Sequence, residues 1–138
     1  MAVLRYNWLA SSGTANTLTS GSVVGGNAVN MNDNARQKIK YLAADVNLLA
    51  DTNTFTWALK WQVSNDNSTW VDCSNGPQNA AAVTYATGTA GADTAVRKTI
   101  EAPESVYAWR YARIALVTGG TTGASIDTYS LAYSARTA

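Results

Sequence analysis

The chain has 138 residues and a formal net charge of +1, and 46% of its residues are apolar and 14% charged. This length suits one domain with a real core, and the balanced charge offers no surplus that would attract nucleic acid or an anionic membrane. The sequence contains no histidine, which removes the commonest general base and the commonest metal ligand. We therefore expect no enzymatic activity, no catalytic residue, no metal and no cofactor.

Cysteine usage points to a reducing environment. Cys73 is the single cysteine, so no disulfide can form within the chain, and a thiolate-rich metal site would need ligands from other chains. The N-terminal residues lack a basic region followed by a sustained apolar block. We expect neither a signal peptide nor a membrane span, and synthesis in a cytoplasm is the natural interpretation.

Residues 1–34 are expected to form an extended N-terminal arm. From residue 11 onward this segment consists mostly of Ser, Thr, Gly and Asn, a composition that cannot build its own packed core. We expect the arm to become ordered against another subunit, with a short strand near residues 27–31.

The tip of this arm is unusually aromatic. Arg5, Tyr6 and Trp8 lie in a stretch that alternates between polar and large apolar side chains, which is the pattern of a short strand or of an adhesive terminus. Because such a terminus has no evident place in a core, we expect these three residues to contact a protein partner.

Residues 35–49 open the second predicted unit and have two interpretations. Apolar residues recur at helical spacing at Ile39, Leu42 and Val46, but basic residues also alternate at positions 36, 38 and 40. The first pattern predicts a helix and the second a strand. The resemblance described below favours the strand.

The clearest prediction is a hairpin over residues 54–73. Large apolar side chains occupy every second position from Phe55 to Val63, with polar residues between them, which indicates a half-buried strand. Residues 65–68 supply turn chemistry, and an extended pattern centred on Trp70 follows.

The remaining sequence predicts further short strands. We expect them at residues 82–86, 95–100, 106–117 and 126–133, with a loop over 88–93 and a glycine-rich turn over 118–123. Short strands at near-regular spacing are typical of an all-β fold, here an antiparallel β-sandwich or jelly roll over residues 35–138.

Motifs that resemble catalytic or metal sites favour ordinary structural roles. Gly119, Gly120 and Gly123 lack the lysine and helix of a phosphate loop. Glu101 and Glu104 flank a proline, as solubilising loop charges do. Acidic residues between 66 and 72 do not match the spacing of a calcium loop.

Aromatic residues are the most informative part of the composition. Five tryptophans and seven tyrosines are more than one small core easily hides, so we expect some at interfaces. Trp109, Arg110 and Tyr111 form the densest aromatic and basic stretch, and we predict that they contact a protein partner. Nucleic-acid binding is disfavoured there because the chain has no basic surplus.

Two stretches carry a resemblance to a known group of proteins. Residues 61–73 read WQVSNDNSTWVDC, and residues 107–133 read YAWRYARIALVTGGTTGASIDTYSLAY. They resemble small β-sandwich proteins encoded among tailed-phage virion genes, in which a strand ending in Q-S-D-G-x-x-W is followed later by an aromatic-arginine strand and a glycine-rich hairpin. The matching positions are Gln62, Ser64, Asp66 and Trp70, then Trp109, Arg110, Arg113 and Gly119 to Gly123. Asn67 stands where the glycine is usual.

The resemblance implies a capsid decoration or cement protein, a structural protein of the virion made in the host cytoplasm and located on the capsid surface. Such proteins are commonly trimeric and sit over junctions of the major capsid protein, so the expected partners are that protein and further copies of this chain, without nucleic acid or membrane. Discoidin-like carbohydrate-binding sandwiches share a similar S-x-D-G-x-x-W signature. A carbohydrate-binding module of a tail or head fibre, with Trp70 or Trp109 as its stacking platform, is therefore the alternative.

Overall fold

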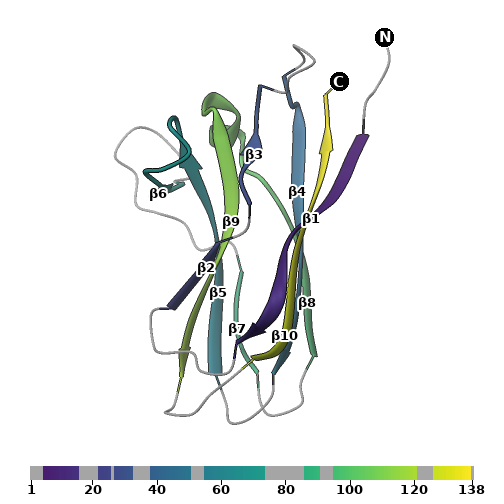
Figure 1. Cartoon of the computed structure of the whole chain (residues 1–138), viewed down its shortest axis with the longest axis vertical. Helices are drawn as coiled ribbons and strands as arrows, with labels where there is room; N and C mark the ends of the chain where they lie inside the picture. Colours follow the sequence, from purple (N-terminus) through teal and green to yellow (C-terminus); the bar gives the residue numbers. More distant parts are fainter. Residues whose placement is uncertain are drawn as a thin grey trace.

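The fold consists of two antiparallel β-sheets packed face to face (Figure 1). The computed structural model describes residues 5–15, 22–25, 27–32, 38–50, 55–73, 86–90, 95–120 and 126–137. The expected all-β class is confirmed. In the described part of the chain, no helix is long and apolar enough to cross a membrane.

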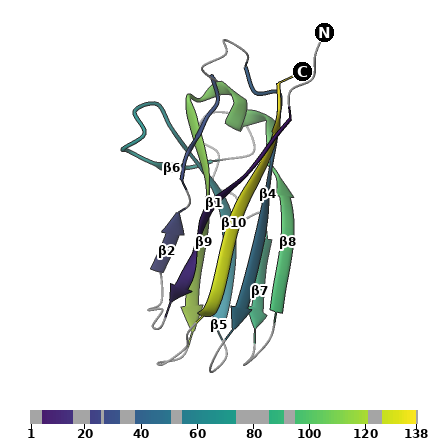
Figure 2. The same ribbon diagram turned by 45° about the vertical axis from the view of Figure 1, so that its right-hand side comes forward.

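Sheet A contains four strands in the order β1-β10-β4-β8, which Figure 2 shows side by side. They span Arg5–Ala15 (β1), Tyr41–Ala50 (β4), Ala95–Glu101 (β8) and Ile126–Arg136 (β10). The register pairs Arg5 with Arg136, so β1 begins and β10 ends at the same end of the molecule.

Sheet B is built around the long central pair β5 and β9. Its strands are β2 (Ser22–Gly25), β3 (Val29–Asn30), β5 (Phe55–Ser64), β6 (Val71–Asp72), β7 (Ala86–Ala90) and β9 (Tyr111–Gly120). Both β2 and β3 pair with β9, and both β6 and β7 pair with β5. Each edge of sheet B is thus formed by two short strands, β2 with β3 on one side and β6 with β7 on the other. Counting each of these pairs as one strand, both sheets have four strands, in the order of a jelly roll.

Alternation along the strands builds the core. In β5, Trp57, Leu59, Trp61 and Val63 are buried while the residues between them face outward or are half-buried, as the period of a strand requires. The other sheet contributes Leu42, Ala44, Val46, Leu48, Leu131, Tyr133 and Ala135. The core is therefore the space between the two sheets.

Two side chains, one from each sheet, reach across this core and hydrogen-bond to the backbone of the other sheet. The Trp61 indole Nε1 on β5 donates to the Glu101 carbonyl on β8 at 3.2 Å, and the Tyr133 hydroxyl on β10 accepts from the Ile114 amide on β9 at 2.7 Å. The two rings lie 6.1 Å apart, tilted by 31°. Each sheet thus satisfies a buried polar tip of the other, which fixes their relative offset.

The Tyr133 contact fills a gap in the ladder of β9. The strand β3 pairs with Tyr111 and Ala112, and β2 pairs from Ala115 onward. Ile114 lies between these pairings, so its amide needs a partner from elsewhere. The hydroxyl that comes across the core supplies it.

The ambiguous segment after residue 34 is a strand in its described part. β4 runs from Tyr41 to Ala50, and Leu42, Val46 and Leu48 point into the core. Residues 33–37 lie outside the described structure. Tertiary pairing with β8 and β10 decides in favour of the strand, which local spacing left open.

The predicted strand over 106–117 begins too early. Glu104–Ala108 is a 3₁₀ helix, η1, and β9 starts only at Tyr111. Val106 donates its N–H to the Pro103 carbonyl at 3.0 Å and accepts from Trp109 at 3.2 Å, and its side chain is fully buried. In this 3₁₀ turn one valine is buried between more exposed residues, and this pattern resembles the alternation of a strand.

Two further boundaries differ from expectation. Residues 118–120, expected in a turn, extend β9, where Gly119 and Gly120 pair with Thr56 and Phe55. Residues 86–90, partly expected in a loop, form β7 along β5. In both cases the strand pairs with β5, whose backbone groups need partners along its whole length. Residues 82–85 and 121–125 lie outside the described structure.

The N-terminal segment differs most from expectation, because its described residues pair within the chain. β1 runs along β10, β2 and β3 run along β9, and the predicted short strand near 27–31 is present as β3. Val29 and Met31 are buried in the core. Strands from within residues 1–34 thus complete the sheets of the predicted sandwich domain.

Replacing Tyr133 by phenylalanine tests the cross-sheet bond. Tyr133→Phe leaves the buried Ile114 amide without its acceptor, so the free energy of unfolding should fall by about 1–3 kcal/mol. Denaturant titration measures the change. Tyr111→Phe, on a half-buried ring, is the control and should change stability by less than about 0.5 kcal/mol. Equal effects of the two variants would contradict this role of Tyr133.

The same residue predicts a dependence on alkaline pH. Burial raises the pKa of Tyr133 to about 12 from 10.0. The unfolded chain releases this proton first, so the stability contributed by the neutral hydroxyl is complete below pH 10.0 and is lost as the pH rises towards about 12. Unfolding titrations across this window should show a steeper loss for the natural chain than for Tyr133→Phe.

Candidate functional site

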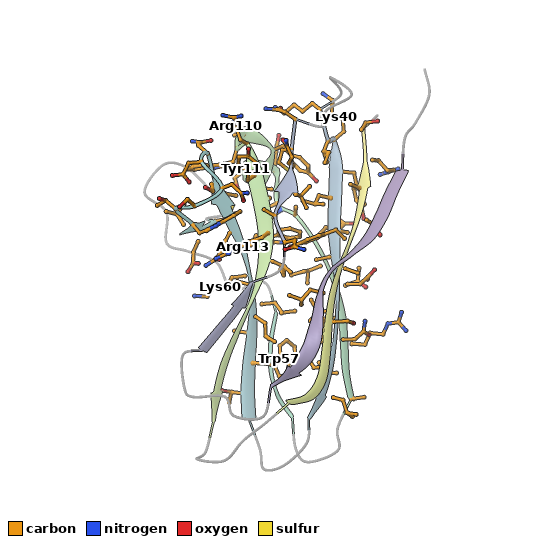
Figure 3. The ribbon with its side chains drawn as sticks, in the orientation of Figure 1. Lys40, Trp57, Lys60, Arg110, Tyr111 and Arg113 are labelled. Atoms are coloured by element: carbon orange, nitrogen blue, oxygen red, sulfur yellow. The ribbon has the colours of Figure 1, made fainter. Side chains whose placement is uncertain are left out.

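The predicted contact residues Trp109, Arg110 and Tyr111 run from the end of η1 into the start of β9. Figure 3 shows Arg110 and Tyr111 at one end of the sandwich. Arg110 is exposed, while Trp109 and Tyr111 are half-buried. The Arg110 guanidinium lies 5.7 Å from the centroid of the Tyr111 ring, within the range of a cation–π contact. The structure thus brings these three residues together with their positions fixed by the core and the strand.

Backbone hydrogen bonds gather further cations at this end. Met31 donates to the Arg110 carbonyl at 2.8 Å, and Ile39 donates to the Met31 carbonyl at 3.1 Å. These bonds place Met31 between Arg110 and the segment with Lys38 and Lys40, so the three exposed side chains lie at the same end of the molecule. Figure 3 shows Lys40 and Arg110 at the same end. We call Lys38, Lys40 and Arg110 the basic end.

The cations of the basic end have no acidic partner within the described residues. The ion pair that the described residues contain lies elsewhere and joins Lys60 on β5 to Asp72 on β6 at 3.2 Å. Exposed charges without a counter-charge are available to a partner surface.

A second group of polar side chains forms a ladder across the outer face of sheet B. Asp72 accepts from Gln62 at 3.0 Å, which with the Lys60 contact lowers the pKa of Asp72. Gln62 in turn accepts from the Arg113 Nε at 2.8 Å. The Arg113 guanidinium covers the Trp70 ring at 4.3 Å from its centroid. These groups satisfy one another, so the ladder is a structural brace of the outer face.

The loop after β5 shows why the Ser-x-Asp pattern occurs. The Ser64 hydroxyl accepts from the Asp66 and Asn67 amides at 3.2 and 3.0 Å. The Asp66 Oδ1 accepts from the Ser68 and Thr69 amides at 2.8 and 2.7 Å and from the Ser64 hydroxyl at 2.8 Å. These bonds hold the pKa of Asp66 well below its usual range.

Asn67 completes this turn with φ at 59°. That value lies in the left-handed region, where glycine is unstrained and asparagine is the best-tolerated alternative. The departure from the usual glycine therefore keeps the same turn. The signature shared with the phage sandwiches and the carbohydrate-binding sandwiches is, in this chain, a hydrogen-bonded turn.

No group of three or more potential metal-ligating side chains occurs within the described residues. Glu101 accepts a hydrogen bond from the Tyr41 hydroxyl at 3.1 Å, and Glu104 lies in the first turn of η1.

Trp70 and Trp109, the two candidate stacking platforms, have different surroundings from each other and from Trp61. Trp61 is fully buried, and one face of Trp70 is occupied by Arg113. Trp109 lines an open hollow of about 220 Å³ together with Asn65, Asp66, Thr69 and Val71. Of these three rings, Trp109 is the one that borders a free space.

The N-terminal contact residues have defined backbone positions only. The register pairs Tyr6 with Ala135 and Trp8 with Tyr133, and both partners are buried. The side chains of Arg5, Tyr6 and Trp8 lie outside the described part of the structure. Their contact with a partner stays a prediction.

Sequence reasoning noticed Lys38 and Lys40 as one side of a strand but did not count them among the contact residues. These lysines are far from Arg110 in the sequence, so their position at the same end could not be predicted from the sequence. The backbone hydrogen bonds through Met31 show it. The alternation of basic residues at 36, 38 and 40 was the available signal. A row of exposed cations beside an aromatic-arginine stretch indicates a contact surface.

No protein-family model and no curated protein matches this sequence. Among solved structures, the chain is similar to part of the structure of infectious bursal disease virus Gx strain, with a TM-score of 0.59 and 9% identity over 97% of this chain and 32% of that chain. It is also similar to part of the crystal structure of the PBSX exported protein XepA, with a TM-score of 0.53 and 15% identity over 94% of this chain and 36% of that chain. The chain spans about a third of the length of each. At these identities the likeness shows the fold alone.

Substitutions at Asn67 test the turn. Asn67→Gly should leave the free energy of unfolding within about 0.5 kcal/mol of the natural chain, because glycine adopts a positive φ freely. Asn67→Ala should lower it by about 1–2 kcal/mol, because a Cβ without a polar group is strained there. Thermal and denaturant unfolding measure both. An alanine variant as stable as the glycine variant would contradict this explanation of the signature.

Proposed function

We propose that this chain is a structural protein of a virion that binds the outer surface of a tailed-phage capsid as a decoration or cement subunit. The observation that carries the proposal is the basic end, where exposed cations that pair with no acidic side chain of the described residues lie at the same end as the aromatic-arginine stretch of residues 109–111. The charged and aromatic side chains there come from two segments, residues 38–40 and 109–111, which the fold holds in fixed positions.

Arginine and aromatic side chains are the types that protein interfaces use most. Tyr111 is half-buried beside Arg110, so little side-chain entropy is left to lose when a partner covers it. Trp109 packs partly against the core. Such anchors are typical of the few residues that carry most of the binding energy.

The charge of this end specifies the partner chemistry. Lys38, Lys40 and Arg110 favour an acidic surface, and their contribution should decrease as salt screens it. The overall charge of +1 gives little attraction to nucleic acid. An acidic protein surface, such as a region of a major capsid protein, is the partner that fits.

The fold supports the proposal without specifying it. Jelly rolls are common in viral capsid domains, and the two similar structures come from a virus particle and from a PBSX exported protein. A fold hosts many functions, so the argument rests on the basic end rather than on the likeness.

Stabilisation of the shell would follow from mass action. A protein that binds the assembled capsid and not the separated subunits shifts the equilibrium towards assembly. We propose further that the chain forms a homo-oligomer, with a trimer favoured, and that it has no enzymatic activity. An oligomer strengthens attachment by engaging several capsid sites at once.

Deleting residues 1–34 is not a clean test of this function. The deletion removes β1, β2 and β3 together with the buried Val29 and Met31. Loss of capsid binding would then report unfolding of the sheets. Point substitutions on the surface are the appropriate variants.

Charge reversal at the basic end provides the test. The triple variant Lys38→Glu, Lys40→Glu and Arg110→Glu should bind shells purified from the encoding phage at least about tenfold more weakly in cosedimentation, about 1.4 kcal/mol or more. Binding of the natural chain should also weaken as salt rises. The loss should come without a change in thermal unfolding, because all three side chains are exposed.

The matched control reverses two exposed cations on an edge strand far from this end. Arg97→Glu with Lys98→Glu, on β8, should bind shells as the natural chain does. Equal loss in both variants would mean that only net charge matters, and full binding by the triple variant would overturn the proposed docking end.

A further inference from the structure

The open hollow beside the basic end shares Trp109 with the proposed docking surface, but the rest of its lining lies outside that surface. Its lining comes from the loop after β5, from β6 and from the residue after η1, namely Asn65, Asp66, Thr69, Val71 and Trp109. Its volume of about 220 Å³ is smaller than the roughly 300–1,000 Å³ of pockets for drug-sized ligands. The space suits one small ring.

One wall of the hollow is apolar and firmly held. Val71 is 46% exposed, which makes it the exposed large hydrophobic residue of the described chain. Trp109 packs partly against the core and donates its backbone N–H to Val106 at 3.2 Å. A fixed indole and an exposed valine form an apolar surface that a ligand can cover at low entropic cost.

The opposite rim is polar and equally preorganised. Three hydrogen bonds from Ser64, Ser68 and Thr69 converge on the Asp66 Oδ1. None of these three bonds reaches the Oδ2, and the Thr69 side chain makes a further hydrogen bond to the carboxyl. The carboxyl is ionised at neutral pH, these bonds hold its pKa lower still, and a charged acceptor makes short, strong hydrogen bonds with hydroxyl donors.

The charge of the lining selects against anionic ligands. Asp66 is the charged residue of the lining and repels an anion. A ligand that matches the apolar wall and the Asp66 acceptor has an apolar face, carries hydroxyl groups and bears no negative charge.

We propose that this hollow binds one neutral sugar ring of a glycan. The C–H face of the ring lies on Trp109 and Val71, and a hydroxyl donates to Asp66. The site goes beyond the proposed attachment to a capsid, because Asp66 and Val71 are not part of the docking surface and the ligand is a sugar ring in place of a protein surface. A capsid subunit with such a site would also contact the glycans of a cell surface.

The test is an NMR titration of the isotopically labelled full chain with neutral monosaccharides, together with an array of bacterial surface polysaccharides. We expect shifts confined to the amides of residues 65–71 and to the Trp109 indole. Trp109→Ala should abolish them. Asp66→Asn should weaken affinity by about tenfold, which is about 1.4 kcal/mol, because it keeps the Oδ1 acceptor of the turn and replaces the other oxygen by a donor.

Two controls make the outcome decisive. Asp45→Asn, on the outer face of sheet A where it accepts from Thr99, should bind sugars as the natural chain does, and thermal unfolding verifies that each variant is folded. The proposal is overturned if no sugar or polysaccharide shifts these residues, if Trp109→Ala binds normally, or if a lysine-rich peptide produces the shifts in place of sugars. The triple charge-reversal variant should still bind sugar, which separates this site from capsid attachment.

Discussion

The two reciprocal hydrogen bonds through the core are the constraint on which the rest of the structure depends. Trp61 binds the backbone of sheet A from sheet B, and Tyr133 binds the backbone of sheet B from sheet A. Apolar packing alone fixes the spacing of two sheets but tolerates sliding, whereas a buried donor and acceptor demand one geometry. A slip of the sheets would break both bonds at once, so the jelly roll has one favoured offset.

The positions of the basic end and of the hollow beside Trp109 follow from that offset. Tyr133 holds Ile114, and β9 leads back from there to Tyr111, Arg110 and η1. The Tyr107 hydroxyl of η1 accepts from the Leu42 amide of β4 at 2.8 Å, which anchors the same end to sheet A. The basic end and the hollow beside Trp109 are therefore attached to both sheets, and a partner meets a surface that is already in place.

Sequence reasoning predicted what local pattern determines. The alternation around Trp61 and the turn chemistry at Asp66 are complete within one hairpin, so both were found, as was the all-β class. The prediction from sequence was wrong where pairing between distant strands determines which residues are buried. Val29 and Met31 lie in a polar stretch whose burial depends on β9, far along the chain, and Val106 imitates a strand while forming a 3₁₀ turn. Residues 109–111 were predicted from composition to contact a partner, whereas Lys38 and Lys40 come to the same end only in the folded chain.

The most direct measurement of the central claim is cryo-electron microscopy of virions of the phage that we propose encodes the chain, with mass spectrometry to count copies of the chain. The account predicts jelly-roll density on the outside of the shell, with the end that carries Lys38, Lys40 and Arg110 turned towards acidic capsid residues. Virions that lack the chain, or density with that end turned to solvent, would contradict it.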